Sequence, residues 1–239
     1  LSQTYKNFEI IFWDNNSTDN TQKIINSYIS NTKIKYFKSQ KHELLYSARK
    51  QAVDVSSGEF IAFLDVDDWW DKEKLNRQIK LFRLKDVGIV CSNYWLVNER
   101  KNLKPKKVFK RIPEGWVLNK LLKKNFVGMS SLVISKKAYL SLNYGFNKNY
   151  EIIGDYDLVL RLSSKWKLAA VQHPCSYYRW HGENLSIKKM KLNNDELLSW
   201  INKMKKNKIF TDQPNFKYLI SQTFFYNALI LTLSKKRLS

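Results

Sequence analysis

Carboxylates gather directly after an apolar run near the middle of this 239-residue chain. Residues 60–64 are apolar, and Asp65, Asp67 and Asp68 follow at once. Asp65 and Asp67 are one residue apart, so in an extended segment their side chains point the same way. Mg²⁺ and Mn²⁺ favour such oxygen ligands, with water and phosphate oxygens completing the shell, and would neutralise charge on a departing diphosphate. The alternative is an acidic turn in which Asp71 caps the next helix.

A further carboxylate, Asp14, also ends an apolar run, at residues 8–13. A carboxylate at the end of a buried strand can accept hydrogen bonds from a base or a ribose, or it can cap the helix that follows. The residues alone leave these two interpretations open.

Strand and helix patterns alternate through the first ninety residues. Apolar or alternating runs predict strands at residues 8–13, 33–38, 59–64 and 87–91, and helical spacing predicts helices at residues 19–29, 44–55 and 72–84. This order predicts an α/β fold with a mainly parallel central sheet flanked by helices. Ligands of such sheets bind at the carboxyl ends of the strands, where Asp14 and Asp65 lie.

The second half continues with longer helices. We expect helices at residues 115–124, 155–164, 193–206 and 215–233, and extended segments at residues 131–134, 167–171 and 176–180. The predicted organisation is one domain whose α/β first half spans residues 1–92 and whose second half spans residues 93–192. A basic helical extension follows at residues 193–239.

The net charge of +21 is unevenly distributed. Residues 1–100 carry 15 basic and 13 acidic side chains, whereas residues 101–150 carry 12 and 1, and residues 201–239 carry 8 and 1. A basic second half is typical of a protein with an anionic partner: nucleic acid, anionic lipid headgroups or a phosphorylated substrate. The lysines could instead only solvate helix surfaces.

Composition excludes several classes of protein. A hydrophobic content of 44% excludes a disordered chain, and no apolar run reaches the ~18 residues that span a bilayer. Cys91 and Cys175 are too few to staple a fold of this size, so we expect reduced thiols in a cytosolic protein.

Five short segments follow one another along the chain: WDNNSTDNT at residues 13–21, AR at 48–49 with GEFI at 58–61, DVDD at 65–68, GDYDLVLR at 154–161 and YRWH at 178–181. They resemble the motifs D-D-G-S-T-D-x-T, A-R-N…G-E-Y-I, D-x-D, E-D-x-D-L-x-x-R and Y-R-x-H of the family 2 glycosyltransferases. These enzymes have the GT-A fold and use nucleotide-diphosphate sugars. Each motif alone is weak, but five in this order are a specific signal that covers most of the chain.

The resemblance implies that residues 1–92 form a nucleotide-sugar-binding half and residues 93–192 an acceptor-binding, catalytic half. Asp14 is implied to bind the uracil ring, and Asn15 and Arg49 are implied to belong to the same nucleotide-sugar site. Arg49 could instead only fix the loop through an ion pair, and that structural role is slightly favoured. Asp65 is implied to lie at the ribose and the metal, and Asp67 to ligate the metal directly. His181 is implied to lie near the metal or the diphosphate.

On the acceptor side, Asp155 is the implied catalytic base. It would take the proton from the acceptor hydroxyl as that oxygen attacks the anomeric carbon, which gives inversion in one displacement. Ser130 and Ser131 lie where the family shapes its acceptor pocket.

Three departures accompany the resemblance. Asn15 and Asn16 replace the second Asp and the Gly of the nucleotide loop, which leaves the nucleotide preference open. Gly154 replaces the Glu ahead of the base. The family's first strand has no counterpart before Leu1, so we expect this sequence to be a fragment that lacks it.

The sequence therefore predicts an inverting, metal-dependent glycosyltransferase of bacterial surface polysaccharide biosynthesis, including lipopolysaccharide. It is expected to move a hexose or N-acetylhexosamine from a UDP-sugar to a glycan or lipid-linked oligosaccharide. We expect a cytoplasmic protein held peripherally on the anionic cytoplasmic face of the inner membrane. The alternatives are a nucleic-acid-binding protein or metal-dependent nuclease, which leaves the acid clusters less well explained, and a catalytically degenerate GT-A binding module.

Overall fold

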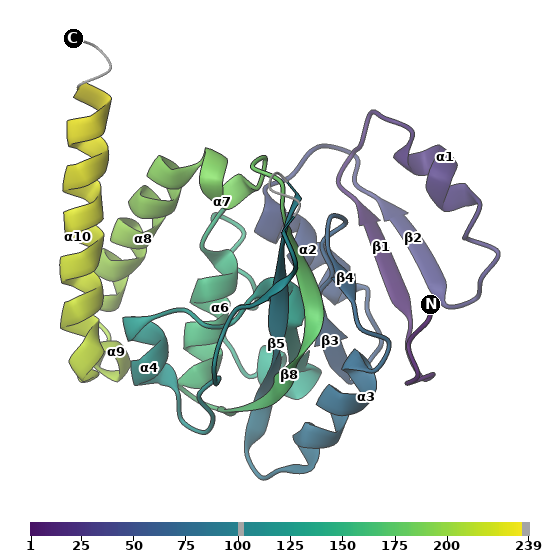
Figure 1. Cartoon of the computed structure of the whole chain (residues 1–239), viewed down its shortest axis with the longest axis horizontal. Helices are drawn as coiled ribbons and strands as arrows, with labels where there is room; N and C mark the ends of the chain where they lie inside the picture. Colours follow the sequence, from purple (N-terminus) through teal and green to yellow (C-terminus); the bar gives the residue numbers. More distant parts are fainter. Residues whose placement is uncertain (100–102, 236–239) are drawn as a thin grey trace.

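The computed structural model describes residues 1–99 and 103–235, and within them strands and helices form an α/β fold (Figure 1). The strands are β1 (Ile10–Asp14), β2 (Ile34–Lys38), β3 (Phe60–Ala62), β4 (Trp69–Trp70), β5 (Val87–Asn98), β6 (Lys106–Lys107), β7 (Leu132–Ser135) and β8 (Lys167–Trp180). The α-helices are α1 (Thr21–Asn26), α2 (Leu45–Asp54), α3 (Lys74–Ile79), α4 (Leu118–Lys123), α5 (Lys136–Leu140), α6 (Gly154–Ser163), α7 (Leu185–Lys188), α8 (Met190–Met204), α9 (Lys208–Thr211) and α10 (Pro214–Lys235). Short 3₁₀ turns are η1 (Lys80–Arg83) and η3 (Met129–Ser131).

The strands form two sheets. β1 and β2 pair in parallel as a separate two-stranded sheet, and a six-stranded sheet has the order β3-β7-β5-β8-β4 with β6 paired to β5. The α/β class is confirmed, but the expected mainly parallel sheet is wrong in detail: β5 and β8 are parallel, whereas β3–β7, β5–β7, β4–β8 and β5–β6 are antiparallel. A continuous apolar run indicates that a strand is buried on both faces. Helices can cover both faces of parallel and antiparallel strands alike, so the run does not indicate strand direction.

The longest strand, β8, joins two segments that the sequence analysis kept apart. Its register against β5 shifts between Ser92 and Tyr94, opposite the stretch that holds Pro174. Proline lacks an N–H for the ladder and is tolerated at such irregularities. The bent strand carries the chain from the core to His181.

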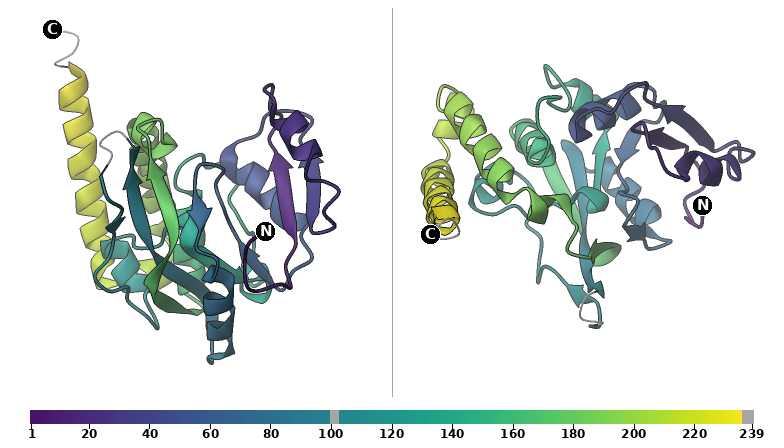
Figure 2. Two further views of the ribbon diagram at one scale, coloured as in Figure 1. Left: turned by 45° about the vertical axis from the view of Figure 1, so that its right-hand side comes forward. Right: turned by 90° about the horizontal axis from the view of Figure 1, so that it is seen from above.

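The core lies between the main sheet and the helices that cover it. Its fully buried side chains include Ile89 on β5, Leu132 on β7, Leu158 and Leu160 on α6, and Trp200 on α8. At the end of the molecule opposite the β1–β2 sheet, α10 stands alongside α8 (Figures 1 and 2). None of the helices in the described residues combines the length and the apolar character needed to cross a membrane.

The predicted boundaries of the three parts lie inside secondary-structure elements. The boundary at 92/93 lies within β5, and the boundary at 192/193 lies within α8. The first two parts thus share β5, and the division of the chain into these parts stays a prediction. Residues 236–239 of the predicted extension lie outside the described residues.

Candidate active site

The loop after β1 is organised around the buried carboxylate of Asp14. It accepts hydrogen bonds from the backbone N–H of Ser17 at 2.7 Å and from the hydroxyl of Tyr36 at 2.8 Å. Burial disfavours its charged form, but these hydrogen bonds outweigh that effect and lower the pKa of Asp14. Asp14 therefore stays ionised and fixes the loop, and its contact with uracil stays a prediction. No sequence signal marked Tyr36, which comes from the neighbouring strand.

The departures from the family's nucleotide loop have a local explanation. The Asn15 side chain donates to the carbonyl of Glu43 at 2.8 Å and accepts from the N–H of Glu43 at 3.0 Å. An aspartate could make only the second of these bonds, because its carboxylate cannot donate. Asn16 has φ of 63°, the left-handed conformation that asparagine tolerates best after glycine. The two asparagines thus keep a tight loop and tie it to the segment before α2.

At the turn between β3 and β4, Asp67 meets the end of β8. One carboxylate oxygen of Asp67 lies 3.0 Å from Nε2 of His181, and both side chains are partly exposed. Oxygen and imidazole ligands that each bind one divalent cation at about 2.1 Å lie about 3 Å apart when they are at right angles. The pair therefore fits a shared Mn²⁺ or Mg²⁺ ion. Within residues 1–99 and 103–235, no group of three or more acidic, His or Cys side chains is placed to hold a metal ion.

The other acid of this motif, Asp65, forms an ion pair with Arg49 of α2. The guanidinium is largely buried and lies over the ring of Tyr46, 5.1 Å from its centroid. The attraction of Asp65, Tyr46 and Asp155 outweighs burial and raises the pKa of Arg49, so it remains charged. The structure thus brings Arg49 and Asp65 together, whereas contact of Asp65 with ribose or metal stays a prediction.

Asp68 joins the turn to the sheet beneath it. Its carboxylate accepts from the hydroxyl of Ser130 and, at 3.0 Å, from the backbone N–H of Arg179. Burial raises the pKa of Asp68 to about 6 against the effect of these bonds. The hydroxyl of Ser131 donates to the carbonyl of Gly128, and both serines are buried. Contact of Ser130 and Ser131 with an acceptor stays a prediction, and their burial favours a supporting role. Asp71 accepts from the N–H of Glu73 in the turn ahead of α3, but the N-cap of α3 is Glu73 and has no side-chain capping bond, so the predicted helix cap at Asp71 is wrong.

The candidate base, Asp155, lies in the first turn of α6. It accepts from the backbone N–H of Tyr156 at 2.7 Å. Burial raises the pKa of Asp155 above its ordinary value, and Arg49, this N–H and the hydroxyl of Tyr46 oppose the rise. A carboxylate with a raised pKa is a stronger proton acceptor than an exposed one once it is ionised.

Gly154, which replaces the family's Glu, lies against the ring of Tyr46. A Cβ at Gly154 would lie 2.3 Å from Cγ of Tyr46, far inside van der Waals contact. The buried hydroxyl of Tyr46 donates to the carbonyl of Ile152 at 3.1 Å. The ring of Tyr46 thus fills the space that a side chain at position 154 would need. In the sequence, this contact is indicated only by the glycine at position 154.

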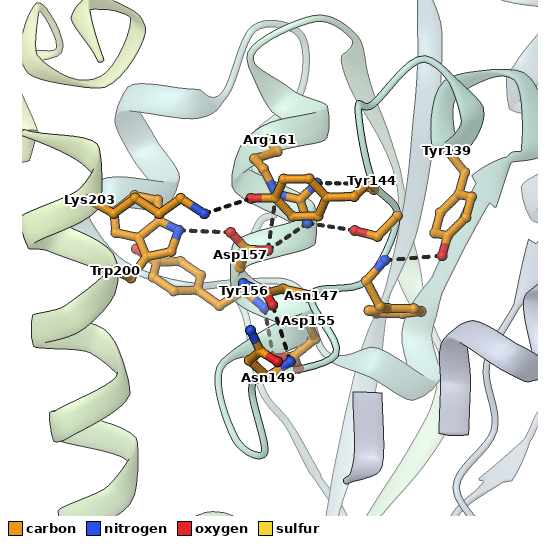
Figure 3. A network of polar contacts seen from close by, with 12 residues as sticks. Tyr139, Tyr144, Asn147, Asn149, Asp155, Tyr156, Asp157, Arg161, Trp200 and Lys203 are labelled. Carbon is orange, nitrogen blue, oxygen red and sulfur yellow. Dashed lines mark hydrogen bonds and ion pairs between the residues drawn. The ribbon is translucent and has the colours of Figure 1, made fainter. Parts of the chain in front are cut away.

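A second acid of α6, Asp157, belongs to a buried network (Figure 3). It is 1% exposed, accepts from Nε of Arg161 at 3.0 Å and accepts from Nε1 of Trp200 at 2.9 Å. Arg161 also donates to the carbonyls of Tyr144 and Gly145 at 2.8 and 2.7 Å. The two acids of the motif thus have different surroundings: Asp157 holds helices and a loop together, and Asp155 lies beside Arg49.

We expect Asp157→Asn to lower the free energy of unfolding by about 3–5 kcal/mol, because it leaves the buried Arg161 without a counter-charge. Urea unfolding followed by tryptophan fluorescence measures this. Asp155→Asn, which removes one charge two residues away, is the matched control and should unfold like the parent chain. If Asp157→Asn unfolds like the parent chain but loses turnover, Asp157 takes part in the reaction and its role is not only structural.

Comparisons with known proteins identify the family of the chain. Residues 1–139 match the family described as Glycosyl transferase family 2. The chain is 32% identical over 194 residues to the UDP-Glc:alpha-D-GlcNAc-diphosphoundecaprenol beta-1,3-glucosyltransferase WfaP of Escherichia coli, a match that covers 80% of this chain and 73% of WfaP. It is 27% identical over 195 residues to the putative teichuronic acid biosynthesis glycosyltransferase TuaG of Bacillus subtilis, over 71% of this chain and 75% of TuaG. The crystal structure of S. aureus TarS 1–349 with UDP has a TM-score of 0.61 and 18% identity, and the match spans 82% of this chain and 59% of that one.

The fold and the family match define the protein as a glycosyltransferase with a GT-A-like α/β fold. The chain belongs to glycosyltransferase family 2. Of the three functions that the sequence left open, the comparisons therefore support the transferase.

Proposed function

We propose that this chain transfers a hexose or N-acetylhexosamine from a UDP-sugar, with inversion, to a glycan or lipid-linked acceptor in bacterial surface polysaccharide biosynthesis. One observation carries the proposal: Arg49 pairs with Asp65 of the D-x-D turn and lies within electrostatic reach of Asp155 on α6. The D-x-D turn and the candidate base thus both lie close to the buried guanidinium of Arg49. Relatives that act on UDP-glucose, such as WfaP, support the choice of donor.

In the proposed reaction, Asp155 accepts the proton of the acceptor hydroxyl while that oxygen attacks the anomeric carbon and the UDP–sugar bond breaks. Asp67 and His181 would hold the Mn²⁺ or Mg²⁺ ion, which supplies positive charge to the departing diphosphate. Asp14 and Asn15 fix the loop proposed to hold the uridine. Arg49 positions Asp65 and keeps Asp155 ionised.

The test of this function is turnover with a panel of UDP-hexoses and UDP-N-acetylhexosamines, with sugar-diphosphate-lipid and free-glycan acceptors. Proton NMR of the product reads the anomeric configuration. An α-linked donor should yield a β-linked product. A product that retains the donor's configuration would exclude the single displacement, and no turnover with any donor would favour a binding module.

The pH dependence of turnover should depend on Arg49. Asp155 must be ionised to act as a base, and the charge of Arg49 lowers its pKa against the effect of burial. We expect Arg49→Met to raise the pKa of Asp155 and to move the acidic limb of kcat/KM to higher pH by about one unit or more. A pH profile measures this, and Arg49→Lys, which keeps the charge, should move the limb less. An unchanged limb would show that Arg49 does not act on the base.

We further propose that the protein lies peripherally on the anionic cytoplasmic face of the inner membrane, where a lipid-borne acceptor is presented. The 12 basic side chains against 1 acidic between residues 101 and 150 support this. Each well-placed Lys or Arg contributes ~1 kcal/mol to binding an anionic leaflet. Sedimentation with phosphatidylglycerol vesicles at low salt should remove the protein from solution, and failure to do so would exclude this location.

A further inference from the structure

A basic pocket of about 740 Å³ lies between α4, the segment before it and α10. Four cations line it, and none of its lining residues is acidic: Arg111, Lys120, Lys123 and Lys124. All four are exposed, and within the described part of the chain none forms an ion pair. Like charges around one hollow repel each other, and a bound anion removes that repulsion. The pocket is therefore suited to phosphate.

The remaining wall of the pocket is largely apolar. Leu122, Phe126 and Leu219 are buried side chains that line it, and Phe109 lies beside Lys124, whose Nζ is 5.7 Å from the ring centroid. Such a surface is not needed for inorganic phosphate, which has no apolar part. It suits a ligand that carries a hydrocarbon next to its phosphate.

The apolar surface continues along α10 beyond the pocket. Tyr218 and Gln222 line the pocket, and Phe225 and Leu229 follow at the three- and four-residue spacing that places side chains on one helix face. Phe225 is 62% exposed and Leu229 is 41% exposed. The helix extends along the edge of the molecule (Figure 2). An apolar stripe thus leads away from the cations.

The pocket and the candidate base are held by consecutive residues. Tyr156 lines the pocket and its hydroxyl donates to the carbonyl of Leu121 on α4 at 3.0 Å. The backbone N–H of the same residue donates to the carboxylate of Asp155 (Figure 3). The pocket and the candidate base thus share an attachment to the first turn of α6.

We propose that this pocket binds the diphosphate of a prenyl-diphosphate-linked acceptor, with the hydrocarbon along the Phe225–Leu229 face of α10. The inference rests on the proposed transferase function and adds a second anion site to it. That site is separate from the one proposed for the UDP diphosphate at Asp67 and His181.

The test is calorimetric titration of farnesyl diphosphate without divalent metal, into the parent chain and two triple variants. One variant carries Lys120→Ala, Lys123→Ala and Lys124→Ala. The other carries Lys205→Ala, Lys206→Ala and Lys208→Ala, which remove the same charge outside the pocket. We expect the pocket variant to bind at least about tenfold more weakly and the matched variant to bind like the parent. Equal weakening in both would show general charge attraction and overturn the proposal.

Further ligands separate the sources of the phosphate. Inorganic diphosphate should bind at least about tenfold more weakly than farnesyl diphosphate, and Phe225→Ser with Leu229→Ser should reduce only the binding of the prenyl compound. Equal affinity for both diphosphates would overturn the lipid assignment, as would loss of phosphatidylglycerol vesicle binding without loss of farnesyl diphosphate binding in the pocket variant. UDP binding in the presence of Mn²⁺ should be unchanged in the pocket variant. The UDP titration thus tests the proposed donor site independently of the proposed prenyl-diphosphate site.

Discussion

Asp155→Asn is expected to reduce kcat by about three orders of magnitude while the chain stays folded and still binds UDP. The amide has nearly the size of the carboxylate but cannot accept the proton of the acceptor hydroxyl, and general-base contributions are typically 10²–10⁴-fold. Asp155 lies at the start of α6, where burial raises its pKa and the charge of Arg49 opposes that rise. The effect should fall on kcat, because the donor is held by other residues.

The measurement is steady-state turnover together with UDP titration and urea unfolding of the same preparation. Asp195→Asn, which removes an exposed charge on α8, is the control for the change in net charge. Turnover within about tenfold of the parent would exclude Asp155 as the base. Loss of UDP binding in the variant would instead place it in the donor site.

Asp67→Ala is expected to lower turnover by about 10²–10³-fold, and excess Mn²⁺ or Mg²⁺ should not restore it. The carboxylate of Asp67 is the one that faces His181, whereas Asp65 is paired with Arg49 and Asp68 accepts from Ser130 and Arg179. Of the three acids in the turn, Asp67 is thus the one that we propose to bind the cation. His181 alone offers a single neutral ligand, too few to hold a divalent ion at a diphosphate.

Turnover against metal concentration measures this effect. Asp71→Asn is the matched control, since Asp71 accepts a bond from the N–H of Glu73 in the turn before α3 and an amide oxygen can accept the same bond. Full activity of Asp67→Ala at high metal concentration would show that the residue only tunes affinity. Full activity without metal would remove the cation from the mechanism.

The sequence predicted much of the local structure because strands and helices follow from short-range patterns. Asp14 ends β1 as expected, and α6 begins within one residue of its predicted start, whereas β3 ends at Ala62, three residues before Asp65. Strand direction was not predicted correctly. The path of the chain between β5 and β7 makes these strands antiparallel, and the apolar sequence of a strand does not indicate that path. The single long β8 was read as two segments because Pro174 interrupts the pattern.

The candidate site, like the fold, could be predicted from the sequence only in part. Residue types in a motif indicate which acids to examine, but they do not say which acid is free. Asp157 lies in the same motif as Asp155, yet its partner Trp200 is 43 residues away. Tyr46, 106 residues from the Ile152 carbonyl that it contacts, could not be found from spacing. Such contacts depend on the folded chain.

The most direct test of the account is calorimetric titration of UDP into the protein with Mn²⁺, without metal, and into Asp67→Ala with Mn²⁺. The account predicts binding that requires Mn²⁺ and is lost in the variant, because the cation joins the diphosphate to Asp67. Binding of equal strength in all three titrations would contradict the metal site. No binding to the parent chain with Mn²⁺ would contradict the UDP-sugar site itself.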